Sequence, residues 1–165
     1  MNHPFRITKA LLALASTIAC AKAPTPESQS NGSLVGTWRI IRHSPPAGAD
    51  TAAALSFGSR PRGYLVYDAT GHVFLQLQDA VAADSVGSRW REAPDSVLKT
   101  LLHGFQAYFG TYRVDSVAQL VTHRLEGELL PRFGAVEVAT PFRLWGDSLI
   151  LGADSLERWL FVRVR

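Results

Sequence analysis

Short segments of β type, separated by turn residues, occupy almost the whole chain after position 34. The first is GTWRIIRH, starting at Gly36, and the last is ERWLFVRVR, ending at Arg165. Apolar and polar residues alternate in these segments, which is typical of strands with one buried face. Eight such strands, joined in chain order by brief connections, can close into a small barrel. The pattern therefore predicts an all-β fold, an eight-stranded antiparallel up-and-down β-barrel.

The clearest pair of strands lies in the stretch GYLVYDATGHVFLQLQ. Two β-type arms, Tyr64–Tyr67 and Val73–Gln78, flank the turn sequence Asp-Ala-Thr-Gly. Gly71 can supply the positive φ that such a turn needs, so we predict a β-hairpin. Tyr64 and Tyr67 lie on opposite faces of the first arm, and the alternation does not decide which of them points inward.

One segment changes period and predicts the single inserted α-helix. In PDSVLKTLLHGFQAYFG the apolar residues recur at helical spacing, which favours a helix over 95–109. Asp95 or Ser96 can cap its start, and Gly110 can end it. Residues 79–94, before it, have the pattern of a loop, although the Ala and Val residues within them allow a helical turn. We expect the apolar stripe of this helix to dock on the barrel. The stripe consists of Leu98, Leu101, Leu102, Phe105, Tyr108 and Phe109.

The first 20 residues have the pattern of an export signal. They start with a short basic region, continue with the apolar run ALLALASTIA, and end at Cys20. As a helix this run of ten residues would rise only about 15 Å, half of what a membrane span requires. A small residue before a cysteine resembles the bacterial lipoprotein signal, which implies lipidation of Cys20. The alternative is ordinary cleavage after Ala21, which would leave a soluble secreted or periplasmic protein.

A polar stretch separates this signal from the folded part. Residues 21–33 are rich in Pro, Ser, Asn and Gln and carry no large apolar side chain, so we predict a flexible tether. The barrel domain then spans 34–165. Cys20 is the single cysteine, which excludes a disulfide within the chain. We expect the domain to be exported and held at the bacterial cell envelope by a lipid on Cys20.

The charge balance does not favour nucleic-acid binding. The chain has 17 basic and 14 acidic residues, a formal charge of +3. Arg6 and Lys9 fall in the signal, which holds no acid, so 15 basic and 14 acidic residues remain. The remaining basic residues are mostly arginines, and they are dispersed rather than clustered. We therefore expect no nucleic-acid partner.

Several phrases in a fixed order resemble a bacterial lipocalin-like domain family, over Leu34 to Arg165. They are LVGTWRII, RGYLVYDATGHVFLQL, AYFGTYRVD, VTHRLEGELLPRFGA and FRLWGDSLIL. Unlike the secreted animal lipocalins, this chain has a helix midway and no disulfide. The resemblance implies that the tryptophan of the first strand packs against an arginine near the chain's end. Trp38 with Gly36 would then close the barrel against Arg163 or Arg165, and we take Arg163 as the partner.

His123 is the most informative candidate for a binding residue. In LVTHRLEGEL the alternation places His123 on the same face as Val121, Leu125 and Leu129. This apolar face should point into the barrel. Inside the barrel an imidazole could hydrogen-bond a ligand or transfer a proton near neutral pH. The alternative is a core histidine whose hydrogen bonds are satisfied by a tyrosine or a backbone carbonyl.

Three aromatic residues complete the predicted ligand-binding set. Tyr108 and Tyr112 bracket the glycine between the predicted helix and the next strand. Tyr112 shares a face with Val114, so its ring is expected to point inward, where its hydroxyl needs a partner. Phe74, in the second arm of the hairpin, is the third member.

These features favour binding of a small, mostly apolar molecule, with no cofactor and no catalysis, by a monomer. The histidines lack the spacing of a metal site, and no nucleophile elbow or phosphate-binding loop occurs. One alternative is a small barrel enzyme, an isomerase or cyclase of a reactive apolar substrate that uses His123 and Tyr112. Another is a filled barrel that acts through its outer surface.

Overall fold

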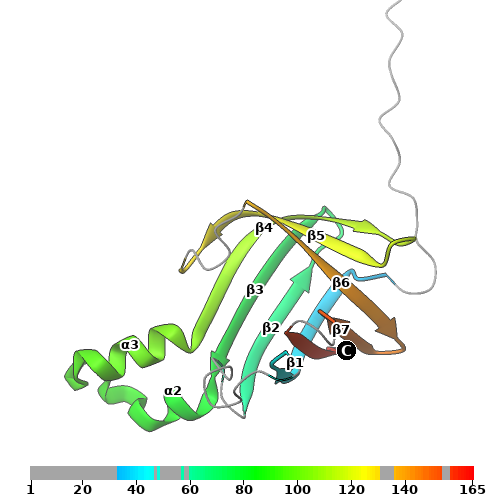
Figure 1. The fold of residues 1–165 in the computed structure, drawn as a ribbon. Coiled ribbons are helices and arrows are strands. Elements are labelled where there is room, and N and C mark those ends of the chain that lie inside the picture. The colour runs from blue at the N-terminus through cyan, green and yellow to red at the C-terminus, as the bar shows by residue number, and fades with distance from the viewer. Residues whose placement is uncertain (1–32, 47, 49–56, 58–59, 131–135, 154–156) are drawn as a thin grey trace, which may run out of the picture.

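Each strand of the sheet pairs with the next along the chain, and β8 returns to pair with β1, which closes the barrel (Figure 1). All of these pairings are antiparallel. The computed structural model describes residues 33–46, 48, 57, 60–130, 136–153 and 157–165. The predicted eight-stranded antiparallel up-and-down barrel is confirmed. Its strands are β1 (Gly36–Ser44), β2 (Pro61–Tyr67), β3 (His72–Asp79), β4 (Phe105–Asp115), β5 (Leu120–Glu128), β6 (Glu137–Trp145), β7 (Ser148–Leu151) and β8 (Arg158–Arg163).

The predicted hairpin forms β2 and β3. Gly71 in the turn between them has φ +92°, as the turn sequence requires. The register pairs Tyr67 with Val73 and Leu65 with Leu75. Residues directly opposite in an antiparallel pair share a face. Tyr67 therefore points inward with Val73 and is fully buried, while Tyr64 is half exposed on the outer face.

The helical insertion lies between β3 and β4 and differs in detail from the prediction. It consists of α2 (Ala80–Val86), the 3₁₀ helix η1 (Gly87–Glu92) and α3 (Asp95–His103). Most of 79–94 is therefore helical rather than a loop, which exceeds the helical turn that the sequence allowed there. The helix predicted over 95–109 begins at Asp95 but ends at His103, because Gly104 caps it and Phe105 then pairs with β3. No helix in the described residues is long and apolar enough to cross a membrane.

The prediction that this helix docks on the barrel is also wrong. The insertion projects beyond one end of the barrel (Figure 1), and α3 has no buried residue. Half of the predicted stripe belongs to strand β4 rather than to the helix, so the apolar face of the real helix is too small to bury. Leu102 is 41% exposed, and a charge placed there would stay in solvent instead of disrupting the core.

Two β-bulges break the alternation that the sequence predicts. In β1, Ile40 and Arg42 pair with the consecutive residues Phe161 and Leu160, so Ile41 is extra. A bulge re-aims the side chains that follow it, and here it turns His43 into the barrel interior.

The second bulge is in β5. Gly110 pairs with Leu125 while Phe109 pairs with Gly127, which leaves Glu126 extra. Leu129, predicted on the inner face, lies beyond this bulge and is 45% exposed. The alternation therefore predicts the inward direction of His123 and Leu125 correctly, but it does not apply to residues after the bulge.

The pairing of β1 with β8 is reinforced by Trp38 and Arg163, which lie opposite each other in the register. The indole of Trp38 is fully buried, and its Nε1 donates a hydrogen bond to the Leu34 carbonyl at 2.7 Å. The guanidinium carbon of Arg163 lies 4.1 Å from the centre of the indole ring. Arg163 also donates to the carbonyls of Val35 (2.7 Å) and Ser33 (2.8 Å). One arginine thus ties the last strand to the chain that leads into the first.

Gly36 makes room for this arginine. A Cβ at position 36 would stand 2.5 Å from Nη1 of Arg163, and the φ of +142° is itself unfavourable for other residues. The structure thus brings together Gly36, Trp38 and Arg163. Arg165, the other candidate, pairs instead with Asp147.

We predict that Trp38→Ala lowers the free energy of unfolding by about 3–5 kcal/mol, because a large, fully buried aromatic side chain is lost. Trp38→Phe should cost clearly less, since most of the apolar volume remains. The matched control is Trp145→Ala, because Trp145 is 84% exposed and its loss should cost under about 0.5 kcal/mol. Chemical denaturation of the three variants measures this. Equal effects at positions 38 and 145 would contradict the packing.

Candidate functional site

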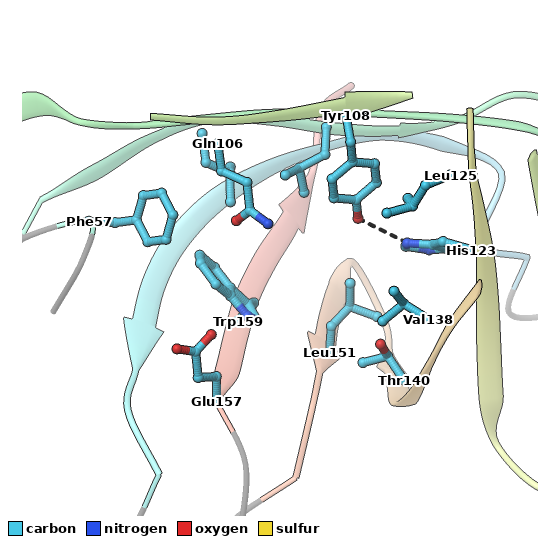
Figure 2. A pocket seen from close by; sticks show the side chains of 12 residues that line it. Phe57, Gln106, Tyr108, His123, Leu125, Val138, Thr140, Leu151, Glu157 and Trp159 are labelled. Atoms are coloured by element: carbon cyan, nitrogen blue, oxygen red, sulfur yellow. Dashed lines mark hydrogen bonds between the residues drawn. The ribbon is translucent and has the colours of Figure 1, made fainter. Parts of the chain in front are cut away.

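The barrel encloses a cavity of about 290 Å³, which Figure 2 shows from close by. It lies toward the end of the barrel from which the helical insertion projects, since β3 and β4 line it near the residues that adjoin that insertion. The opposite end, near the β2–β3 turn, is filled by fully buried side chains such as Trp38, Tyr67 and Val73. Most of the wall is apolar. The aliphatic members are Leu75, Leu77, Leu125, Val138 and Leu151.

A histidine between two tyrosines forms the polar part of the inner wall. His123 Nε2 lies 2.8 Å from the Tyr67 hydroxyl, and its Nδ1 lies 2.9 Å from the Tyr108 hydroxyl. His123 is on β5 and Tyr67 is on β2, so their hydrogen bond crosses the barrel interior, while Tyr108 comes from the neighbouring strand β4. All three side chains are buried, and Tyr108 and His123 border the cavity, as Figure 2 shows.

His123 is neutral at physiological pH. Desolvation by burial lowers its pKa from 6.5 to about 4. Burial also raises the pKa of Tyr67 and of Tyr108 well above their usual value, so both phenols keep their protons. A neutral imidazole carries one N–H donor and one bare acceptor nitrogen. One tyrosine must therefore donate to His123, and the other must accept from it.

The surroundings of Tyr67 indicate which tautomer forms. Among the described residues the Tyr67 hydroxyl has a single hydrogen-bond partner, Nε2 of His123. A fully buried hydroxyl has to place its proton on an acceptor, so Tyr67 donates to Nε2. Nδ1 then carries the hydrogen and donates to the Tyr108 oxygen. The hydrogen of Tyr108 in turn points away from the imidazole. The chain of bonds thus runs from Tyr67 through His123 to Tyr108 at the cavity wall.

Two other predicted binding residues lie outside the cavity. Tyr112 faces inward and packs edge-on against Tyr67, with ring centres 4.7 Å apart. Its hydroxyl donates to the Asp68 carbonyl at 2.9 Å, away from the cavity wall. Phe74 does not contribute to the cavity either: it is 45% exposed on the outer face, because its inward-facing neighbours are Val73 and Leu75.

Tyr67, the second partner of His123, is not among the binding residues that the sequence predicts. Alternation within β2 alone could not assign its direction. The register of the hairpin decides it: Tyr67 lies opposite Val73, and Val73 belongs to the apolar face of its strand.

Aromatic rings and a carboxylate line the outer end of the cavity. Trp159 and Phe57 meet at a ring-centre distance of 5.1 Å, and the His43 ring stacks on Trp159 at 4.0 Å. Glu157 also borders the cavity, and its side chain is half exposed, so this end reaches solvent. Its Oε2 lies 3.7 Å from Nε2 of His43. Both ring nitrogens of His43 are buried and form no hydrogen bond within the described residues.

Within the described ranges no three His, Cys, Asp or Glu side chains converge as a metal site requires.

The chain matches the model of one protein family, described as a lipocalin-like domain, over residues 35–157. No curated protein matches the chain. The matched region includes nearly all of the barrel and every residue that borders the cavity except Trp159.

We predict that His123 makes the protein less stable in weak acid. Its folded-state pKa of about 4 lies below the unfolded value of 6.5, so the unfolded chain binds the proton more readily between these values. The free energy of unfolding should therefore fall as the pH drops from 6.5 to 4, by about 3 kcal/mol from this residue alone.

Urea denaturation of the wild type and of His123→Gln between pH 7 and pH 4 isolates this contribution, since all other titrating groups are common to both proteins. Glutamine stays neutral over this range, so the variant should lack this part of the pH dependence. Parallel stability curves for the two proteins would show that the imidazole is not desolvated.

Proposed function

We propose that this chain, which belongs to the lipocalin-like domain family, binds a small, mostly apolar molecule in its barrel cavity and catalyses no reaction on it. The observation that carries the proposal is the cavity itself. Its volume of about 290 Å³ is at the lower end of the range for ligand pockets, which suits a single ring system or a short chain. Mostly apolar walls with a few convergent polar groups are typical of such pockets.

The affinity and the orientation of a guest would come from different parts of the wall. Leucine and valine side chains would contribute roughly 25 cal/mol for each Å² of apolar surface removed from water. Tyr108 would orient one polar atom of the guest, and His123, whose two nitrogens are engaged by Tyr67 and Tyr108, would hold the Tyr108 ring in place. Because these groups are already held by hydrogen bonds to each other, little conformational entropy would be lost on binding.

The geometry gives less support to the enzyme that we considered. A general base works best when its pKa lies near the operating pH, and the pKa of His123 is about 4. Tyr112, the proposed partner in catalysis, directs its hydroxyl to the Asp68 carbonyl instead. A filled barrel is also disfavoured, since an interior space of about 290 Å³ remains between the side chains.

We also propose the location that the sequence predicts. Lipidation of Cys20 would anchor the domain to the membrane of a bacterial cell envelope, and 21–33 would serve as the tether. Positions 1–32 lie outside the described residues, so the support is the basic start, the apolar run and the single cysteine. The alternative is a soluble exported protein cleaved after Ala21. In either form we propose a monomer without a nucleic-acid partner.

Filling the cavity should abolish binding without harming the fold. Val138 borders the cavity and is only partly buried, so Val138→Phe should place a ring in the space meant for a guest. The matched control is Ala139→Phe, because Ala139 is the exposed neighbour on the same strand. We expect the affinity for octan-1-ol, measured by isothermal titration calorimetry, to fall about tenfold or more in Val138→Phe only, with similar melting temperatures. Equal affinities would place octan-1-ol elsewhere.

The intact mass of the protein extracted from membranes tests the proposed anchor. We expect a chain that begins at Cys20 and carries the added mass of a diacyl or triacyl modification. Cys20→Ala should lose the modification and the membrane association together. An unmodified wild-type chain that begins at Lys22 would instead show ordinary cleavage after Ala21.

A further inference from the structure

We propose that the guest carries a positive charge, an amine or a quaternary ammonium, which binds at the outer end of the cavity between Glu157 and Trp159. This inference rests on the proposed binding function and specifies the chemical class of the ligand. It follows from the distribution of charge along the cavity wall and from the aromatic rings beside the one charged group.

Among the described residues that border the cavity, Glu157 is the one with a formal charge, and none is lysine or arginine. Its carboxylate also lies 3.7 Å from Nε2 of His43. His123 adds no positive charge to these residues, because burial keeps its imidazole neutral at physiological pH. At the described part of the wall a carboxylate guest such as a fatty acid would thus meet an anion and no cation.

The carboxylate lies beside a set of aromatic rings. Trp159 and Phe57 border the cavity at this end, with their ring planes 64° apart. Figure 2 shows Glu157 next to Trp159 on the same side of the cavity. The face of an indole attracts a cation, and the attraction grows as the pair is desolvated. A carboxylate at the edge of such a cluster adds a direct charge interaction.

His43 supports this arrangement from behind. Its ring stacks on Trp159 at an interplanar angle of 29°, and it meets Phe57 edge-on. It thus fixes the orientation of both rings. The bulge at Ile41 is what turns His43 into this position, so an irregularity in β1 serves the outer end of the cavity.

The two ends of the cavity therefore differ in what they recognise. The inner end offers the neutral hydroxyl of Tyr108, which the neutral His123 holds in place. The outer end offers a negative charge and aromatic faces. A guest that satisfies both has an apolar body and a cationic group that faces the solvent side.

Three ligands with the same eight-carbon chain test the proposal, because only their head groups differ: octylammonium, octan-1-ol and octanoate. Isothermal titration calorimetry with the full chain should show octylammonium binding about fivefold or more tightly than octan-1-ol, and octanoate more weakly than either. In Glu157→Gln the affinity for octan-1-ol should stay unchanged, and the preference for octylammonium should disappear. Glu92→Gln is the matched control, since it removes the same charge from an exposed site in η1.

The outcomes separate this inference from the function on which it rests. Octan-1-ol that binds as tightly as octylammonium would overturn the cationic ligand and leave the apolar binding site in place. A preference for octylammonium that survives in Glu157→Gln, or that is lost equally in Glu92→Gln, would overturn the role of Glu157. If none of the three ligands binds, the proposed function itself fails.

Discussion

The contact between Arg163 and Trp38 is the interaction on which the rest of the barrel depends. It joins the last strand to the first, and closure removes the free strand edges that an open sheet would expose. Arg163 also binds the backbone that precedes β1, so the chain is held on both sides of Gly36. With this end filled, the interior space is confined to the opposite end. The cavity is thus a consequence of where the large side chains are.

Closure also explains the chemistry of the inner wall. Because the imidazole of His123 is buried, it is neutral and needs partners for both nitrogens, which Tyr67 and Tyr108 provide. The result is a rigid, neutral, hydrogen-bonded group beside apolar side chains. Among the described residues that border the cavity, this leaves Glu157, at the outer end, as the charged one.

The sequence predicts the barrel well because alternation and turn chemistry are local signals that tertiary contacts reinforce here. It predicts the direction of His123 for the same reason. It fails where tertiary pairing overrides a local pattern: Phe105 and Tyr108 have helical spacing, yet pairing with β3 draws them into β4. The bulge at Ile41 leaves no mark in the alternation, so the inward turn of His43 could not be predicted. The choice of Tyr67 over Tyr64 required the register of the hairpin.

The central claim is that a neutral, buried His123 forms the polar wall of a cavity that accepts an apolar guest. Nitrogen NMR of ¹⁵N-labelled histidine at pH 7, with and without octan-1-ol, tests it most directly, with the exposed His72 as internal reference. We expect His123 to show one protonated and one bare ring nitrogen, and its signals, but not those of His72, to shift as octan-1-ol binds. A doubly protonated His123 at pH 7, or signals that stay unchanged at saturating octan-1-ol, would contradict the account.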